Sequence, residues 1–210
     1  MGTISALAVL TKADRVLHNS DDTLKRWSQT ELLGWLSDGQ RDIVRRVPAA
    51  NARPENVLLV SGPEQSLPSG AHRLLRPLWN TGADGATIGR AVTWTNLDDM
   101  AASDPDWVAA DETDTIQQVM PSESSLGTFF CFPPADGTTY FRGIFSFLPV
   151  DITDANELIE VDDEYAGALM YYVLFAAFLK DAEESANSAR AGSFFTAYMQ
   201  ALGIAPAQGE

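Results

Sequence analysis

The chain has 210 residues, a net charge of −15 and a single cysteine. This length fits one larger domain or two small ones, and one cysteine excludes an intrachain disulfide. No apolar run approaches the roughly 20 residues that span a bilayer. Residues 1–15 lack a basic region and a cleavage site, so we expect a helix there rather than a signal peptide, in a soluble protein of intracellular origin.

The acidic excess is uneven along the chain. Residues 1–60 carry eight basic and seven acidic residues, whereas residues 61–210 carry six and twenty-two. Residues 91–141 contain nine acids and no base. This distribution argues against a protein that reads a nucleic-acid sequence, because such a protein needs cations to neutralise phosphates. An acidic surface kept for solubility and a surface past which DNA slides without binding both remain open.

Two helices are predicted before residue 53. The first, from Ile4 to about Leu17, has apolar residues at broadly helical spacing. The second begins at a capping box of Ser28 and Glu31, in which each side chain meets the backbone N–H of the other residue, and Pro48 ends it. Basic residues near a helix C-terminus favour the helix dipole; here they are Arg41, Arg45 and Arg46.

Residues 53–150 change to short runs rich in β-branched and aromatic residues, separated by Pro and Gly. We expect five or six strands in an antiparallel sheet or small barrel, with one helical turn over Asp98–Ser103. Asp136-Gly137 is a good hairpin-turn dipeptide, so the last two strands are predicted to form a hairpin. The candidate strands are Val57–Val60, His72–Trp79, Arg90–Thr95, Ile116–Met120, Thr128–Phe132 and Tyr140–Leu148.

After Pro149 the pattern becomes helical again. A helix over residues 165–179 is apolar around much of its circumference, which predicts burial on more than one side. Acidic residues cluster before it or in its first turn, as suits a helix N-terminus. A last helix is predicted over residues 185–202, with Gly203 as its cap, and residues 204–210 should form a loose tail.

These elements predict an α+β fold. The economical arrangement packs the two helical ends together and lets the β region project from them. We therefore expect a bundle of about four helices, formed by residues 1–52 and 151–210, with an inserted antiparallel β domain over residues 53–150.

The residue types that bind metals or act as bases are scarce. His18 lies in a polar stretch and His72 in a predicted strand, and no spacing of His and Cys makes a metal site. Cys131 lies in an apolar run, which favours core packing over a reactive thiol. The acidic loops 104–106 and 111–114 fit no calcium-loop pattern, so we interpret them as solvated.

No catalytic motif is present either. Residues 82–85 contain two glycines but lack the Lys-Ser/Thr of a phosphate-binding loop, so they predict a turn. Carboxylates are too numerous for any pair to stand out as glycosidase-like. We therefore predict a protein that is not an enzyme and has no metal or cofactor. The tryptophans could line a groove, although core and interface anchoring is favoured; they are Trp27, Trp35, Trp79, Trp94 and Trp107.

Four blocks, in order, resemble the head-to-tail adaptor proteins of short-tailed bacteriophages, of the tail tubular protein A type. The sequence departs from that family's pattern at Ser37, where Asn is expected, and at Gly167, where a larger residue is expected. The matching blocks are WSQTELLGWLSDGQRDIVRRV (Trp27–Val47), LPSGAHRLL (Leu67–Leu75), DPDW (Asp104–Trp107) and the segment from Tyr165 to Glu183.

The resemblance implies a structural virion protein at the neck between head and tail, made in the host bacterial cytoplasm. Its subunits would form a ring, expected to be a dodecamer, that docks on the portal protein. The ring would extend the DNA channel and provide the platform for the tail nozzle protein. DNA would pass through it without sequence-specific binding, and no membrane would be involved.

A closed ring requires two different contact faces on each subunit. We expect the arginines Arg41, Arg45, Arg46 and Arg53 to meet acids of the next subunit or of the portal, and the tail from Ile204 to reach the portal. The alternative is a monomeric acidic interaction module that mimics DNA and occupies a basic partner. An enzyme that acts through carboxylates is a third interpretation.

Overall fold

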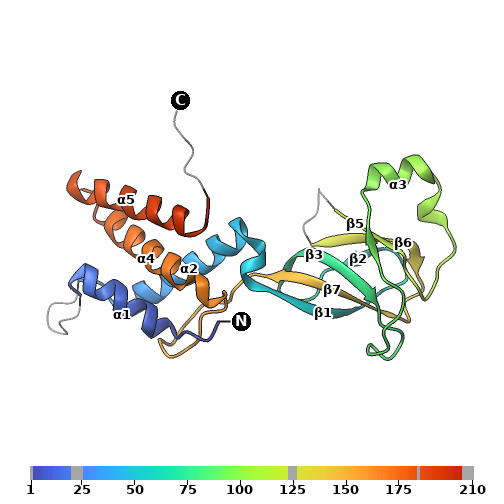
Figure 1. Ribbon diagram of the computed structural model, residues 1–210, viewed down its shortest axis with the longest axis horizontal. Coiled ribbons are helices and arrows are strands. Elements are labelled where there is room, and N and C mark those ends of the chain that lie inside the picture. Colours follow the sequence, from blue (N-terminus) through green and yellow to red (C-terminus); the bar gives the residue numbers. More distant parts are fainter. Residues whose placement is uncertain (1, 20–25, 123–126, 184, 205–210) are drawn as a thin grey trace. The chain divides into compact units, whose positions relative to one another are not determined.

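The structure is a computed structural model that describes residues 2–19, 26–122, 127–183 and 185–204 (Figure 1). Within these residues the fold is α+β, as predicted, with five α-helices and two β-sheets. The chain divides into two compact units. The helical unit consists of residues 1–51 and 149–210, and the β unit of residues 52–148.

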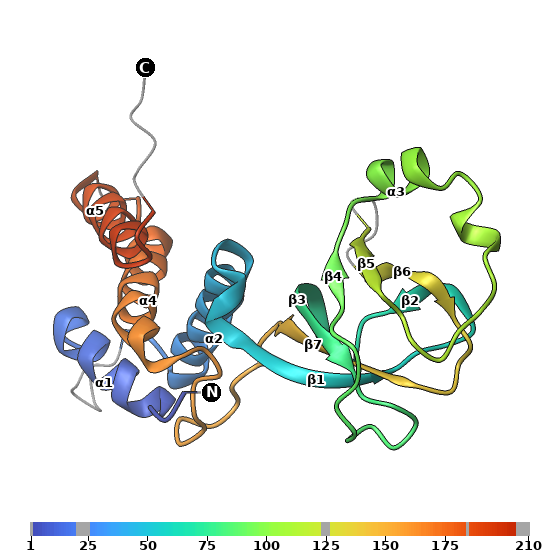
Figure 2. The ribbon, with the colours of Figure 1, turned by 45° about the vertical axis from the view of Figure 1, so that its right-hand side comes forward.

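The helical unit is organised around one apolar helix, α4, which contacts the other three helices of the unit. Figures 1 and 2 show α5 lying along α4. Neighbouring helices therefore cover the apolar side chains of α4 on several sides, as the sequence predicted. The helices of the unit are α1 (Ala6–Leu17), α2 (Gln29–Arg46), α4 (Ala166–Lys180) and α5 (Ser185–Ala201).

The helix ends follow the predicted capping chemistry. The Glu31 backbone N–H donates to Ser28 Oγ over 3.3 Å, and the Ser28 N–H donates to Glu31 Oε2 over 3.2 Å. Gly203, with φ +71°, closes the end of α5, where the Ile204 N–H donates to the Met199 carbonyl. The predicted tail falls, apart from Ile204, on residues 205–210, which lie outside the described residues.

Two buried polar side chains of α2 hold the segment that leads into α4. Ser37 Oγ accepts from the Ile152 N–H over 3.0 Å, and Gln40 Oε1 accepts from the Glu160 N–H over 2.7 Å. A buried backbone N–H without a partner costs about 1–3 kcal/mol. Ser37, the departure from the family pattern, thus has a structural task, whereas Gly167 is exposed with open space at its Cβ position.

The β unit contains two sheets. The first is antiparallel and has the order β1-β7-β3; the second has the order β2-β6-β5-β4, in which β4 and β5 run parallel. The strands are β1 (Ala52–Leu58), β2 (Gly62–Ser66), β3 (Ala71–Asn80), β4 (Thr93–Trp94), β5 (Gln118–Pro121), β6 (Thr128–Ala135) and β7 (Tyr140–Phe147).

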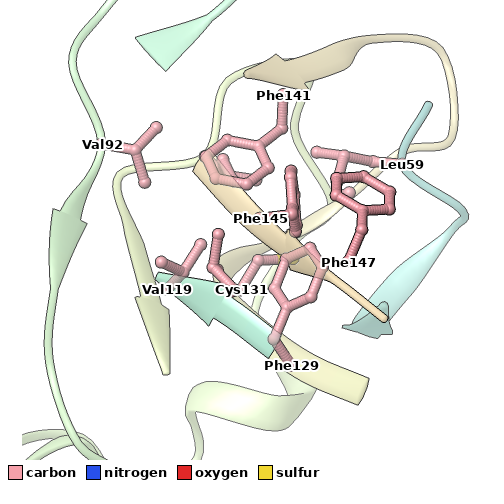
Figure 3. Close-up of a cluster of buried hydrophobic side chains, with 11 residues drawn as sticks. Leu59, Val92, Val119, Phe129, Cys131, Phe141, Phe145 and Phe147 are labelled. Atoms are coloured by element: carbon pink, nitrogen blue, oxygen red, sulfur yellow. The ribbon is translucent and has the colours of Figure 1, made fainter. Parts of the chain in front are cut away.

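Aromatic side chains from the two sheets meet in one core (Figure 3). Phe129 and Cys131 of β6 pack with Phe141 and Phe145 of β7, and none of these side chains is more than 1% exposed. Burial of one such aromatic side chain contributes about 1.5–3 kcal/mol. The two sheets therefore enclose a common hydrophobic core.

The predicted hairpin of the last two strands is wrong. β6 pairs with β2 and β5, whereas β7 pairs with β1 and β3. The turn itself forms, since Asp136 Oδ1 accepts from the Thr138 N–H over 2.9 Å and Gly137 has φ +82°. β6, however, continues to Ala135, so the turn carries the chain from one sheet to the other. Turn chemistry predicted the reversal but not the partner strand.

Strand β2 was not predicted, and the antiparallel expectation fails at β4 and β5. The sequence of β2, GPEQS, contains neither a β-branched nor an aromatic residue, so propensity gave no signal. Its pairing with β6 includes an irregularity between Gly62 and Glu64. Helix α3 (Leu97–Ser103) does form where one helical turn was predicted, with Asn96 as its cap.

Candidate interaction surfaces

The predicted interface residues fall in different parts of the fold. Arg41, Arg45 and Arg46 lie in the last turns of α2, and Ile204 follows α5, so these four belong to the helical unit. Arg53 lies in β1 of the β unit. No single unit of the structure therefore brings the five residues together.

Three of the four arginines interact with groups of their own chain. Arg41 pairs with both Asp38 and Asp151. The guanidinium carbon of Arg53 lies 3.6 Å from the centre of the Phe147 ring, and its Nε is 3.5 Å from a Glu55 carboxylate oxygen. Such half-exposed pairs contribute little to stability, typically below about 1 kcal/mol, but they occupy side chains that were expected to contact a partner.

Arg46 belongs to a network that joins α2 to α5. Its Nε donates to Asp42 Oδ2 over 2.6 Å, and the Tyr198 hydroxyl donates to the same oxygen over 2.6 Å. The Tyr198 side chain is fully buried, and this burial, with the bond to Asp42, raises its pKa. The Tyr198 hydroxyl therefore stays protonated and remains a donor at physiological pH.

Arg45 differs from these arginines. It is exposed in the last turn of α2, and within the described part of the chain no carboxylate lies within ion-pair distance of it. Of the predicted interface arginines, Arg45 is thus the one whose charge is available to a partner.

The acids of the segment 149–165 bind their own backbone. Glu157 Oε1 accepts from the Thr153 hydroxyl and from two backbone N–H groups, and these bonds lower its pKa. Asp163 accepts from the Thr3 hydroxyl and the N–H groups of Thr3 and Ile4, with the same effect on its pKa. This acidic cluster therefore fixes the segment and the N-terminal residues, besides adding negative charge.

The acids between β4 and β5 form no ion pair with a cation of the described residues. This segment includes α3 and the short 3-10 helix η2 (Trp107–Ala109). Among the described residues, none of its carboxylates lies in an ion pair. Six of them are exposed: Asp98, Asp99, Asp106, Asp111, Glu112 and Asp114.

The residues considered for catalysis occupy structural positions. Cys131 is buried in the core, and burial raises the pKa of its thiol to about 11, so it remains neutral. His18 caps α1 in the left-handed conformation, and His72 Nδ1 lies 3.2 Å from the Ser146 carbonyl oxygen. Residues 82–85 form a turn whose Asp84 accepts from Thr87 and Ala86. Each of these residues therefore makes a structural contact within the fold.

The tryptophans divide between the two interpretations given above. Trp27 and Trp107 are buried, at 6% and 7% exposure, whereas Trp94 is 41% exposed and lines a groove with Leu67 and Arg73. Core anchoring is therefore correct for Trp27 and Trp107, whereas Trp94 is exposed and lines the groove.

Metal centres and membrane spans are two other kinds of site. Over the described ranges, no group of three or more His, Cys, Asp or Glu side chains is placed to hold a metal ion. None of the helices within those ranges is both long enough and apolar enough to cross a membrane.

Comparison with known proteins adds the decisive observation. A family model described as SU10 adaptor protein matches residues 4–210. The chain belongs to the SU10 adaptor protein family. It is thus a phage adaptor, a structural protein of the virion neck that associates with other virion components. This agrees with the resemblance carried by the four sequence blocks. A search of the curated proteins found no match.

Proposed function

We propose that this adaptor is one subunit of a ring that docks on the portal protein, extends the DNA channel and provides the platform for the tail nozzle protein. The match to the adaptor family over residues 4–210 carries the proposal. The ordered sequence blocks, which resemble adaptors of the tail tubular protein A type, extend it to a dodecamer. The subunit acts through contacts and through the properties of its surface.

The charge of the chain supports a channel role. A ring of subunits that each carry −15 presents a strongly negative field. Such a field repels DNA phosphates, so a duplex passes through the ring without adhering to it. The six exposed carboxylates between β4 and β5 have no cation partner among the described residues, so their charge is not neutralised within the subunit.

Arg45 is the residue proposed for docking on the portal or on the next subunit. Arg41, Arg46 and Arg53 are proposed to contribute only after exchanging the contacts that they make within the chain. Ile204, at the end of α5, is proposed to contact the portal together with the residues that follow it. A chain truncated after Gly203 should therefore bind the portal more weakly than the full chain.

Mass measurement of the purified protein, alone and mixed with the portal protein of the same phage, tests the proposal. We expect a complex in which several adaptor copies join one portal ring, and Arg45→Glu should weaken it. Arg15→Glu is the matched control, because Arg15 is also an exposed arginine in the last turn of a helix. A chain that stays monomeric and never joins the portal would contradict the proposal and favour the acidic interaction module.

A further inference from the structure

The outward face of the sheet β1-β7-β3 can be identified from the register of β7. Side chains alternate between the two faces of a strand. Phe141 and Phe145 point into the common core, so Arg142 and Ile144 point away from it. The pairing of Asn56 with Arg142 places Asn56 of β1 on the same outward face.

Strand β3 adds two more arginines to this face. Arg76 pairs with Ile144 and Arg73 pairs with Ser146, and both partners are outward positions of β7. Because the register of β3 is irregular, every third residue of this strand points to the same face of the sheet. Leu74, between the two arginines, is buried in the core. We call the outward surface formed by Arg73, Arg76 and Arg142 the basic face.

Within the described ranges, the arginines of the basic face form no ion pair with a carboxylate. Arg73 and Arg76 are exposed, and among the described residues neither lies within ion-pair distance of a carboxylate. Arg142 Nη1 contacts Asn56 Oδ1 at 3.1 Å, which is a neutral amide. A guanidinium keeps its charge at all physiological pH values and is suited to bidentate binding of carboxylates.

The segment between β4 and β5 covers the opposite side of the β unit. Met100 of α3 and Trp107 of η2 pack with Met120 and Phe130, and the Trp107 and Phe130 ring centres are 6.0 Å apart. Residues that alternate with these along β5 and β6, such as Phe129, point to the common core instead. Figure 2 shows α3 beyond β5 and β6, on the side away from β1 and β7.

This covering segment carries the unpaired carboxylates, and we call its outer surface the acidic face. It is formed by Asp98, Asp99 and Asp106; the acids of residues 111–114 lie elsewhere, where Glu112 accepts from the Ser61 hydroxyl and Asp114 lies beside Asn80 and Arg90. The exposed Val108, 55% accessible, lies between Asp106 and Asp111 in the sequence and adds an apolar contact residue of the kind that interfaces bury. The β unit therefore has opposite charges on opposite faces.

We propose that the basic face of one copy binds the acidic face of the next copy, joining subunits head to tail through their β units. The inference rests on the proposed ring and adds which surfaces meet. Two-fold pairing of either face with itself would bring like charges together, which is unfavourable. Contact between unlike faces is the heterologous type that closes rings. The arginines and carboxylates that form no ion pair among the described residues then neutralise each other.

Charge reversal with complementation tests the contact. R73E/R76E makes the basic face acidic, and D98K/D106K makes the acidic face basic. We expect each variant alone to associate about tenfold or more weakly than the native chain, because like charges now meet. A mixture of the two variants should associate again, since each altered face meets its complement. Native association by either variant alone, or a mixture that stays dissociated, would overturn the proposal.

Cross-linking identifies the surfaces and separates this inference from the portal role. R76K places an amine on the basic face that carbodiimide couples directly to a neighbouring carboxylate; R15K, on α1, is the control. The reaction uses a mixture of ¹⁵N-labelled and unlabelled full chains, both free at high concentration and mixed with the portal protein. Mixed-isotope peptides should join position 76 to residues 98–114, and no such peptide should form from position 15.

The outcomes distinguish the two claims. If position 76 couples to residues 98–114 of another copy but no portal complex forms, the contact stands and the proposed function fails. If a portal complex forms and position 76 couples elsewhere or to nothing, the contact is wrong and the proposed function stands. Circular dichroism of each variant checks that the altered chains are folded.

Discussion

The bond between Tyr198 and Asp42 provides a sharp test of how the helical unit is held together. Tyr198→Phe removes only the hydroxyl that donates to Asp42 Oδ2 over 2.6 Å and leaves the buried ring in place. A hydrogen bond to a charged group contributes about 1.5–3 kcal/mol. We expect a loss of about 2 kcal/mol, because the carboxylate retains Arg46 as a partner but loses one of its two bonds on that oxygen.

Tyr172→Phe is the matched control. The Tyr172 ring packs against that of Tyr198, with centres 5.3 Å apart, yet its hydroxyl has no hydrogen-bond partner in the described part of the chain. This change should alter stability by less than about 0.5 kcal/mol. Both substitutions remove one oxygen from a tyrosine at the same helix contact, so their difference isolates the bond to Asp42.

Urea unfolding followed by circular dichroism at 222 nm measures the difference, because most helical residues lie in the helical unit. With a slope of about 2 kcal/mol per M, a loss of about 2 kcal/mol lowers the midpoint by about 1 M. Equal midpoints for the two variants would refute the reasoning and show that the contact between Tyr198 and Asp42 does not hold α5 to α2.

Three further outcomes are expected. Gly39→Ala should destabilise the protein by about 1–3 kcal/mol by overpacking, because a Cβ there would lie 2.9 Å from a Tyr172 ring carbon. Gly34→Ala should stabilise the protein by up to about 1 kcal/mol, because the space at its Cβ position is open. The urea midpoints of the two variants measure both effects. Cys131 should not react with a thiol reagent at pH 8 until the chain is unfolded, since burial raises its pKa to about 11. Hydrogen bonds from Thr87 lower the pKa of the Asp84 carboxylate to about 2, so NMR should show it titrating near pH 2. Its contribution to stability is therefore present above about pH 4 and is lost as the pH falls toward 2. Thr87→Val should raise the pKa of Asp84.

Local signals in the sequence predicted the helices well. The Ser28–Glu31 capping box and Gly203 are short-range features, and their hydrogen bonds form between residues close in the chain. The apolar circumference of α4 also predicted burial on several sides, because a helix with that pattern needs cover on more than one face. In these elements the local pattern and the tertiary packing agree.

In the β unit, local sequence signals did not predict which strands pair. The Asp136-Gly137 turn was correctly placed, yet which sheet receives β7 depends on contacts with β1 and β3, more than 60 residues away. β2 forms through its pairing with β6 rather than through its own propensity. Such pairings depend on packing against residues distant in the sequence, which the strand propensity of individual residues does not report.

The candidate surfaces also depend on contacts between residues far apart in the sequence. Arg73 and Arg76 are three residues apart, a spacing that alternation in a regular strand would place on opposite faces. Only the irregular pairing of β3 with β7 puts both on the basic face. The sequence did identify the acid-rich stretch from residue 91 to 141, because charge composition is a local property, but not the sheet that it covers.

Electron cryo-microscopy of the neck in intact virions tests the central claim most directly. We predict a ring of density directly beneath the portal, with one copy of the helical unit and one of the β unit in each subunit. In that ring the density should show α4 flanked by α1, α2 and α5. A neck whose ring density cannot hold this fold, or virions from which the chain is absent, would contradict the account.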